Sequence, residues 1–169
     1  ELYNNGSDSI DLTGYYIQRK TQTGTSFTSL VTSTNLTGKQ IGVGEYFVIS
    51  RNNVTDTDVV VSGMTLTESN TIQLKNANSE VVDKLCWGSA GDCEGAKVAP
   101  NPTDGKSISL VNGNFIETNP TLGGANTSTE NTNNNSDNNT DTTTESSGSE
   151  NALNSSSSAA SQPSLKLVY

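Results

Sequence analysis

Two cysteines are the first residues of this chain whose type and spacing could support chemistry. Cys86 and Cys93 are separated by six residues, two of which are glycine. A loop this short and flexible allows a disulfide between the two sulfurs. Free thiols and a metal or redox site are the alternatives, and a metal site would need further ligands that the sequence does not provide. The spacing by itself leaves these three interpretations open.

Two short groups of carboxylates are the other candidates for chemistry. Asp56 and Asp58 form a D-x-D motif, and Asp92 and Glu94 flank Cys93. Calcium needs several oxygen ligands from one loop, whereas D-x-D supplies two and the EF-hand spacing is missing. Glycosidase chemistry would need two carboxylates facing each other across a cleft. We therefore interpret these acids as solvated loop charges and predict no metal ligand and no catalytic residue.

The charge and composition of the chain exclude several classes of function. The sequence contains no histidine, which excludes Ser-His-Asp and Cys-His catalysis and His-ligated zinc. The chain has 18 acidic and 9 basic residues, for a net charge of −9. Nucleic-acid binding needs clustered basic residues, and the only hint of such a cluster lies at Arg19, Lys20, Lys39 and Arg51. Solubility explains Arg19 and Lys20 well, so we find no strong nucleic-acid signal, and we predict no membrane span in this sequence and no cofactor.

The elements that must position these residues are strands. Apolar and polar residues alternate at 71–75 and 107–110, which is typical of half-buried strands. The run 46–49 is continuously apolar and predicts a central strand, and β-branched residues mark strands at 59–61 and 81–85. Turn residues separate these segments, and no window shows helical periodicity over three turns. The pattern predicts an all-β sandwich or barrel.

The domain organisation follows from a change of composition at Asn126. Of the 37 residues at 126–162, 26 are Asn, Ser or Thr, and the segment has no Lys, Arg or aromatic residue. Such a segment cannot bury enough apolar surface to offset its conformational entropy. We predict one domain at 1–125, followed by a disordered low-complexity linker at 126–162.

The last residues, 163–169, again have the character of a strand. We predict that they begin a following β module, and the alternative is that they fold back onto the first domain. Because Glu1 starts inside a predicted strand, we also expect the chain to be an internal piece of a longer protein.

Four ordered blocks resemble the lamin-tail domain, an immunoglobulin-like β-sandwich. They span residues 1–126, and each block would be weak evidence alone. The residues that carry the resemblance are ELYNNG at 1–6 with IDLTGY at 10–15, VGEYFVI at 43–49, TIQL at 71–74 with VVDKL at 81–85 and WG at 87–88, and GKSI at 105–108 with NPTLGGAN at 119–126.

The resemblance implies roles for several residues. Trp87 is expected in or against the core, and Gly14 in a turn that needs a positive φ. Leu122 stands where the family's closing motif has proline. The family also has a strand before its first block, so the resemblance implies an open sheet edge beside residues 1–4. Residues 164–169 are the one unassigned segment with the character of a strand that could cover this edge.

The combined interpretation is a non-catalytic binding or spacer module of an exported, bacterial surface protein. Its location would be extracellular or on the cell surface, where Cys86 and Cys93 are expected to form a disulfide. Its partner would be an unidentified protein or surface ligand, together with neighbouring domains of the same chain. The alternative is an accessory domain of a surface enzyme, such as a nuclease, whose catalytic part lies outside this sequence.

Overall fold

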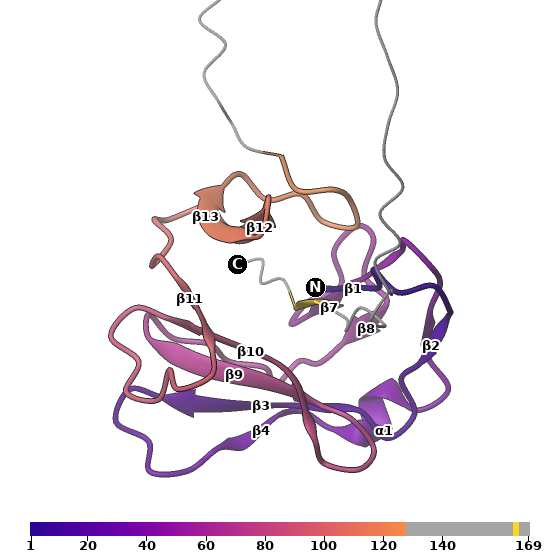
Figure 1. Cartoon of the computed structure of the whole chain (residues 1–169), viewed down its shortest axis with the longest axis horizontal. Helices are drawn as coiled ribbons and strands as arrows, with labels where there is room; N and C mark the ends of the chain where they lie inside the picture. The colour runs from indigo at the N-terminus through magenta and orange to yellow at the C-terminus, as the bar shows by residue number, and fades with distance from the viewer. Residues whose placement is uncertain (128–163, 166–169) are drawn as a thin grey trace, which may run out of the picture.

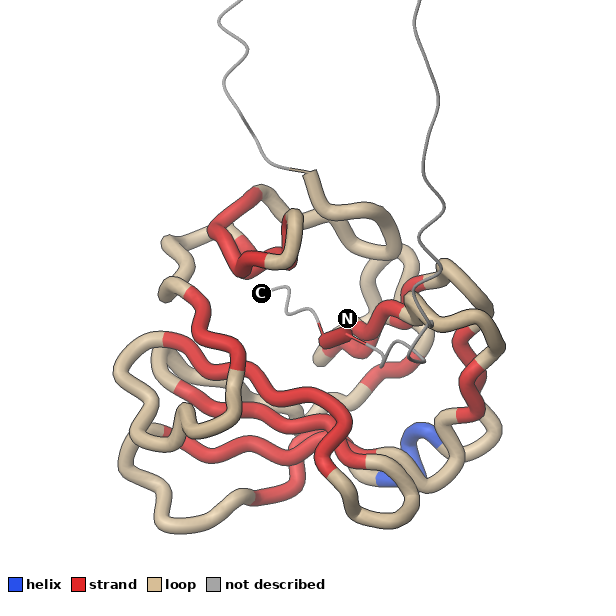
Figure 2. Tube along the Cα trace, in the orientation of Figure 1, coloured by secondary structure: helices blue, strands red, loops and turns tan. Residues whose placement is uncertain are grey.

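The computed structural model describes residues 1–127 and 164–165. Apart from α1 (Ser33–Leu36), every regular element among these residues is a β-strand (Figure 2). The strands are β1 (Leu2–Tyr3), β2 (Ile10–Asp11), β3 (Tyr16–Thr21), β4 (Thr28–Val31), β5 (Gln40–Ile41), β6 (Tyr46–Phe47), β7 (Ile49–Ser50), β8 (Val59–Val60), β9 (Asn70–Lys75), β10 (Val81–Trp87), β11 (Lys97–Ala99), β12 (Ser107–Val111), β13 (Asn114–Thr118) and β14 (Ser164–Leu165). The prediction of an all-β fold is confirmed.

The largest sheet has five strands in the order β11-β10-β9-β3-β4 (Figure 1). Its strands pair antiparallel, except that β11 runs parallel to β10. The middle strand, β9, was expected to be half buried, but its residues are buried on both faces. The reason is that a loop covers the outer face, where the Thr71 hydroxyl donates a hydrogen bond of 2.7 Å to the Asp92 carbonyl.

Shorter strands form the opposite side of the domain. β1 lies between β14 and β6 in a three-stranded sheet, while β7 pairs with β8. The apolar run at 46–49 is therefore divided into β6 and β7, and the prediction of one continuous central strand is wrong. Asp58 explains the division, because its carboxylate accepts the Val48 N–H at 2.7 Å and its own N–H donates to the Val48 carbonyl at 3.0 Å.

The hydrophobic core lies between these strands and the large sheet. Leu2 and Phe47 are contributed by β1 and β6, and the large sheet contributes Ile72 and Trp87. The side chain of Trp87 is completely buried, and its indole Nε1 donates a hydrogen bond of 3.2 Å to the Thr67 carbonyl. The expectation that Trp87 is a core residue is confirmed.

The hairpin of β12 and β13 closes one end of the core. Ile108 is completely buried, and Asn112 and Gly113 form the turn with positive φ values of 49° and 82°. A cluster of buried hydroxyls lies inside the hairpin, where the Oγ of Ser109 and the Oγ1 of Thr118 are 2.6 Å apart. These polar groups satisfy one another, which allows them to lie in the interior.

The turn between β2 and β3 has the positive φ at Gly14 that the resemblance implies, and a side-chain hydrogen bond precedes it. The Asp11 carboxylate accepts the backbone N–H of Thr13 at 2.8 Å, and this hydrogen bond lowers the pKa of Asp11. Gly14 follows with φ of 86°. A Cβ on Gly14 would lie 2.6 Å from the Cβ of Ala77, so the position excludes a side chain for steric as well as conformational reasons.

The two described residues near the C-terminus lie on the domain rather than apart from it. β14 pairs antiparallel with β1, with Leu2 opposite Leu165 and Tyr3 opposite Ser164 (Figure 1). This differs from the prediction that 163–169 begin a following module and corresponds to the fold-back alternative. The physical reason is the edge of β1, whose backbone groups opposite β6 need a partner. Residues 128–163, which include most of the predicted linker, lie outside the described residues.

Candidate binding site beside strand β1

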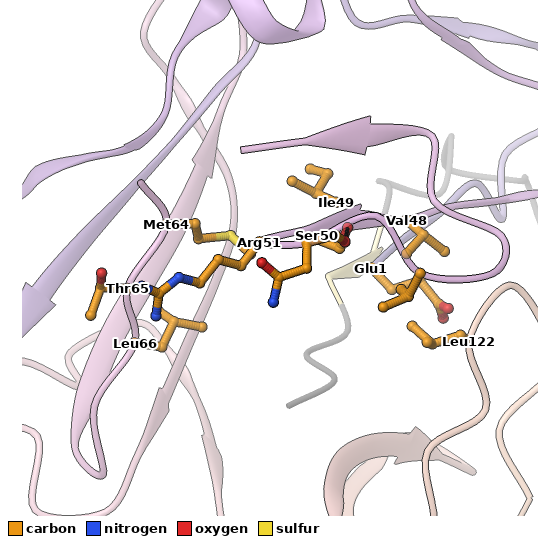
Figure 3. A pocket seen from close by; sticks show the side chains of 11 residues that line it. Glu1, Val48, Ile49, Ser50, Arg51, Met64, Thr65, Leu66 and Leu122 are labelled. Carbon is orange, nitrogen blue, oxygen red and sulfur yellow. Dashed lines mark hydrogen bonds between the residues drawn. The ribbon is translucent and has the colours of Figure 1, made fainter. Parts of the chain in front are cut away.

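An apolar pocket of about 360 Å³ lies where β1 begins (Figure 3). Its lining comes from β7 and the residues around it, from the segment before β9, and from the closing loop after β13. The apolar side chains that line it are Val48, Ile49, Val54, Met64, Leu66 and Leu122. A concave apolar surface of this kind suits an apolar side chain or a small apolar ligand.

The backbone of β7 forms one side of this pocket. The carbonyls of Val48 and Ser50 accept hydrogen bonds from Val59 and Val61 at 3.2 and 2.8 Å, on the side of β8. Because backbone groups alternate along a strand, those of Ile49 and Arg51 point to the other side. Among the described residues, β8 is the single strand neighbour of β7. The site therefore combines a strand edge with an apolar pocket.

The direction of β1, continued beyond Glu1, runs along the edge of β7. β1 and β6 pair antiparallel, with Leu2 opposite Phe47, and continuation of this register places Glu1 opposite Val48. A segment that continued the line of β1 would next pass Ile49 and Arg51. The geometry thus defines the direction in which any extended segment would lie in the site, including residues that precede Glu1 in a longer chain.

Two charged residues line the pocket. Glu1 is buried, and its Oε2 accepts the backbone N–H of Gly123 at 2.8 Å. Figure 3 shows Arg51 extending toward Thr65 and Leu66, away from Glu1. No carboxylate of the described residues forms an ion pair with Arg51. The site therefore offers an apolar pocket next to a positive charge, which favours binding over covalent chemistry.

The two cysteines are joined as expected. Cys86 and Cys93 form a disulfide across a Cα–Cα distance of 5.6 Å. Cys86 is completely buried at the end of β10, so the bridge ties the loop after β10 to the core. It lies outside the pocket lining and serves to hold this loop in place.

The carboxylates at 92 and 58 have structural partners. Asp92 accepts hydrogen bonds from the Nζ atoms of Lys20 and Lys84 at 3.0 and 3.2 Å. The hydrogen bond from Lys20, followed by that from Lys84, lowers the pKa of Asp92. Both ammonium groups also lie over the ring of Phe27. Together with the role of Asp58 beside β7, this leaves Asp58 and Asp92 in hydrogen bonds within the domain, while Asp56 is exposed.

The basic residues that suggested a nucleic-acid surface have other surroundings. Lys20 is paired with Asp92, the Arg19 guanidinium donates to the Thr65 carbonyl, and Arg51 lines the pocket. Within residues 1–127, no group of three or more His, Cys, Asp or Glu side chains is arranged to hold a metal ion. None of the described helices has the length and apolar character needed to cross a bilayer.

Comparison with known families identifies the fold. A model of the Lamin Tail Domain family matches residues 1–89, just over half of the chain. The chain belongs to the lamin tail domain family. No curated protein and no solved structure gives a significant match. The lamin tail domain is an immunoglobulin-like, non-catalytic module, in agreement with the strands described here.

The match covers all strands from β1 to β10 and most of the pocket lining. The fourth sequence block used for the resemblance, which consists of 105–108 and 119–126, lies beyond the matched residues. The structure joins both parts of this block to the domain nonetheless, since Ile108 belongs to the core and the Asn126 amide donates to the Leu110 carbonyl at 3.1 Å.

The pocket was missed by the sequence analysis. Val54, Met64 and Leu66 lie in segments without regular periodicity, so their shared position depends on the fold. The exposed side chain of Val54, in a loop rich in polar residues, is the one local feature that could have indicated the site.

Proposed function

We propose that this lamin tail domain is a non-catalytic binding module of an exported, bacterial surface protein, and that it binds a protein partner in the pocket beside β1. The partner presents an extended segment with an apolar side chain for the pocket and an acidic residue for Arg51. The observation that carries this proposal is the apolar pocket beside an edge of β7 that no strand of the described residues covers.

The physical basis is β-strand addition. An extended segment in line with β1 would form backbone hydrogen bonds with Ile49 and Arg51, while its side chains enter the pocket. In this mode of recognition, backbone pairing supplies affinity and side-chain pockets supply specificity. The positive charge of Arg51 at the exposed end favours an acidic residue in the ligand.

Export is supported by the disulfide. Bridges such as Cys86–Cys93 form and persist in oxidising environments and are rare in the reducing cytosol. To test this, the protein is isolated from its native cells with an alkylating reagent present, and its thiols are counted by mass. We expect no alkylated cysteine, and two alkylated cysteines would contradict export.

The binding site is tested by selecting peptides from a displayed random library against the full chain. We expect enriched peptides with an apolar residue near an acidic one. Leu66→Asp should weaken their binding at least tenfold, because a charge in the pocket must be desolvated by the ligand. Val98→Asp is the matched control, since Val98 is exposed and does not line the pocket. Enriched peptides that bind the Leu66→Asp variant unchanged would contradict the site.

A further inference from the structure

The pairing of β14 with β1 joins segments from opposite ends of the chain. Leu165 lies opposite Leu2, and Ser164 lies opposite Tyr3. β1 has β6 as its other neighbour, so β14 completes the sheet on the edge that β6 leaves open. Leu2 is completely buried in the core, which makes cover of this edge important for the whole domain.

The sequence of the last six residues, which begin with β14, is suited to pairing with a strand edge. Leu165, Leu167, Val168 and Tyr169 make this segment apolar, and Leu165, Leu167 and Tyr169 would share one face of an extended chain. An uncovered strand edge accepts a strand from another chain as readily as one from its own chain, because the backbone groups are the same.

The segment that connects β14 to the rest of the domain is long, so its length allows β14 to pair with its own copy or with a second copy. The 36 residues at 128–163 contain no Lys, Arg or aromatic residue and are dominated by Asn, Ser and Thr. For a flexible chain of this length, the root-mean-square end-to-end distance is about 33 Å. For a flexible chain of 36 residues, this distance corresponds to an effective concentration on the order of 1 mM between the two ends.

We propose that β14 exchanges between copies of this chain, so that the C-terminal strand of one copy completes the β1 edge of a second copy. Reciprocal exchange gives a two-fold dimer, and one-way exchange gives open chains. In dilute solution each copy retains its own strand, because the tether outcompetes a second copy at micromolar concentration. Exchange becomes dominant where copies are crowded to local concentrations near 1 mM, as on a surface. This surface is the edge of β1 opposite β6 and is distinct from the pocket.

The experiment traps the exchanged pair with a disulfide. The acceptor is the full chain with Tyr3→Cys, and with Ser164→Pro and Leu165→Pro to remove its own strand from the edge. The donor is the full chain with Ser164→Cys. Directly paired strand residues have Cα atoms close enough for a disulfide, so exchange places the two new thiols together. A single chain with both Tyr3→Cys and Ser164→Cys reports pairing within one copy.

The register supplies the matched control. A donor with Leu165→Cys places its thiol opposite Leu2 instead of Tyr3 and should cross-link at least tenfold more slowly. Near-ultraviolet circular dichroism of Trp87 confirms that each variant is folded, and peptide mapping confirms that Cys86 remains joined to Cys93.

We expect a disulfide-linked heterodimer from the acceptor and the Ser164→Cys donor. The fraction of acceptor linked per unit time should fall tenfold when both proteins are diluted tenfold. The chain with both cysteines should form its bridge within one copy at a rate independent of concentration. If this bridge forms but folded acceptor and donor give no heterodimer, exchange is refuted. If neither bridge forms, or if the Leu165→Cys donor links equally fast, the pairing on which the proposal rests is refuted.

Discussion

At the scale of single residues, Gly88 shows how closely the backbone of this domain is packed. Its φ is 64°, and a Cβ at this position would lie 2.4 Å from both the Glu68 carbonyl oxygen and the Ser69 hydroxyl oxygen. We expect Gly88→Ala to lower the free energy of unfolding by about 2–3 kcal/mol, from conformational strain together with this clash. Urea denaturation followed by Trp87 fluorescence measures the change.

Gly95 provides a matched control for this substitution. Its φ of 66° is nearly the same, but a Cβ there would meet no atom within 4 Å. Gly95→Ala should therefore cost about 1 kcal/mol, from the left-handed conformation alone. Equal losses in the two variants would show that the contact with Glu68 is unimportant.

Asp92 is one of the residues that make stability depend on pH in acid. Lys20 and Lys84 lower its pKa below the ordinary value of 3.8 in the folded state. Its ionised form therefore stabilises the fold fully above pH 3.8, and this contribution is lost as the pH falls through the lowered pKa. We expect Asp92→Asn to flatten the pH dependence of thermal unfolding below about pH 4.

Asp11 also contributes to this pH dependence, because the Thr13 hydrogen bond lowers its pKa in the same direction. The effect of Asp92→Asn should be reproduced by Lys20→Met combined with Lys84→Met, since these remove the cause of the shift. An unchanged acid transition in both sets of variants would contradict the role of Asp92.

At the scale of elements, the disulfide attaches the loop after β10 to the core. Reduction should lower the free energy of unfolding by about 2–3 kcal/mol, because the unfolded chain loses the constraint of a short closed loop. The fold should persist, since the Thr71 and Lys84 side chains also hold this loop through the carbonyls of Asp92 and Glu94. Urea titration with and without a reductant measures the loss, and unfolding without denaturant would contradict this expectation.

The β12–β13 hairpin depends on its buried hydroxyl cluster. Thr118 is almost completely buried, and its Oγ1 lies within hydrogen-bond distance of the hydroxyls of Ser107 and Ser109. Thr118→Val keeps the shape but leaves the serine hydroxyls with fewer partners, which should cost about 1–3 kcal/mol. Thermal unfolding compares this variant with Thr55→Val, at an exposed position, where we expect less than about 0.5 kcal/mol. Equal effects would contradict a role for the cluster.

At the scale of the whole molecule, the composition predicts that proteases cut within 126–162 and leave a resistant domain of residues 1–125. The structure adds a consequence, because such a cut releases β14 from the chain. If residues 163–169 began a separate module, ending the chain at Asn126 would change stability little. With β14 paired to β1, we instead expect the melting temperature of the cut product to fall by about 5 °C, from the loss of a few backbone hydrogen bonds.

Limited proteolysis followed by differential scanning calorimetry tests both the domain boundary and the contribution of β14 to stability. The uncut chain with Ser164→Pro and Leu165→Pro is the control and should melt at the same temperature as the cut product. Protection extending through 126–162 would contradict the domain boundary, and an unchanged melting temperature would contradict the contribution of β14.

The sequence alone determined those features of this protein that depend on residues close to one another in the chain. Alternation at 71–75 and 107–110 identified β9 and β12, and the motif at 10–15 identified the turn at Gly14. The short, glycine-containing spacing of Cys86 and Cys93 allowed their bridge. These features need only a few consecutive residues, so the local sequence contains the necessary physical information.

Features that depend on distant segments were decided only by the tertiary structure. The apolar run at 46–49 gave no indication of a break, because the side chain that divides it belongs to Asp58. The pocket brings together Val48, Leu66 and Leu122, and the cover of β1 by Leu165 joins the two ends of the chain. Which strands become neighbours depends on the total burial and backbone pairing of the whole domain, and no short stretch of sequence contains that balance.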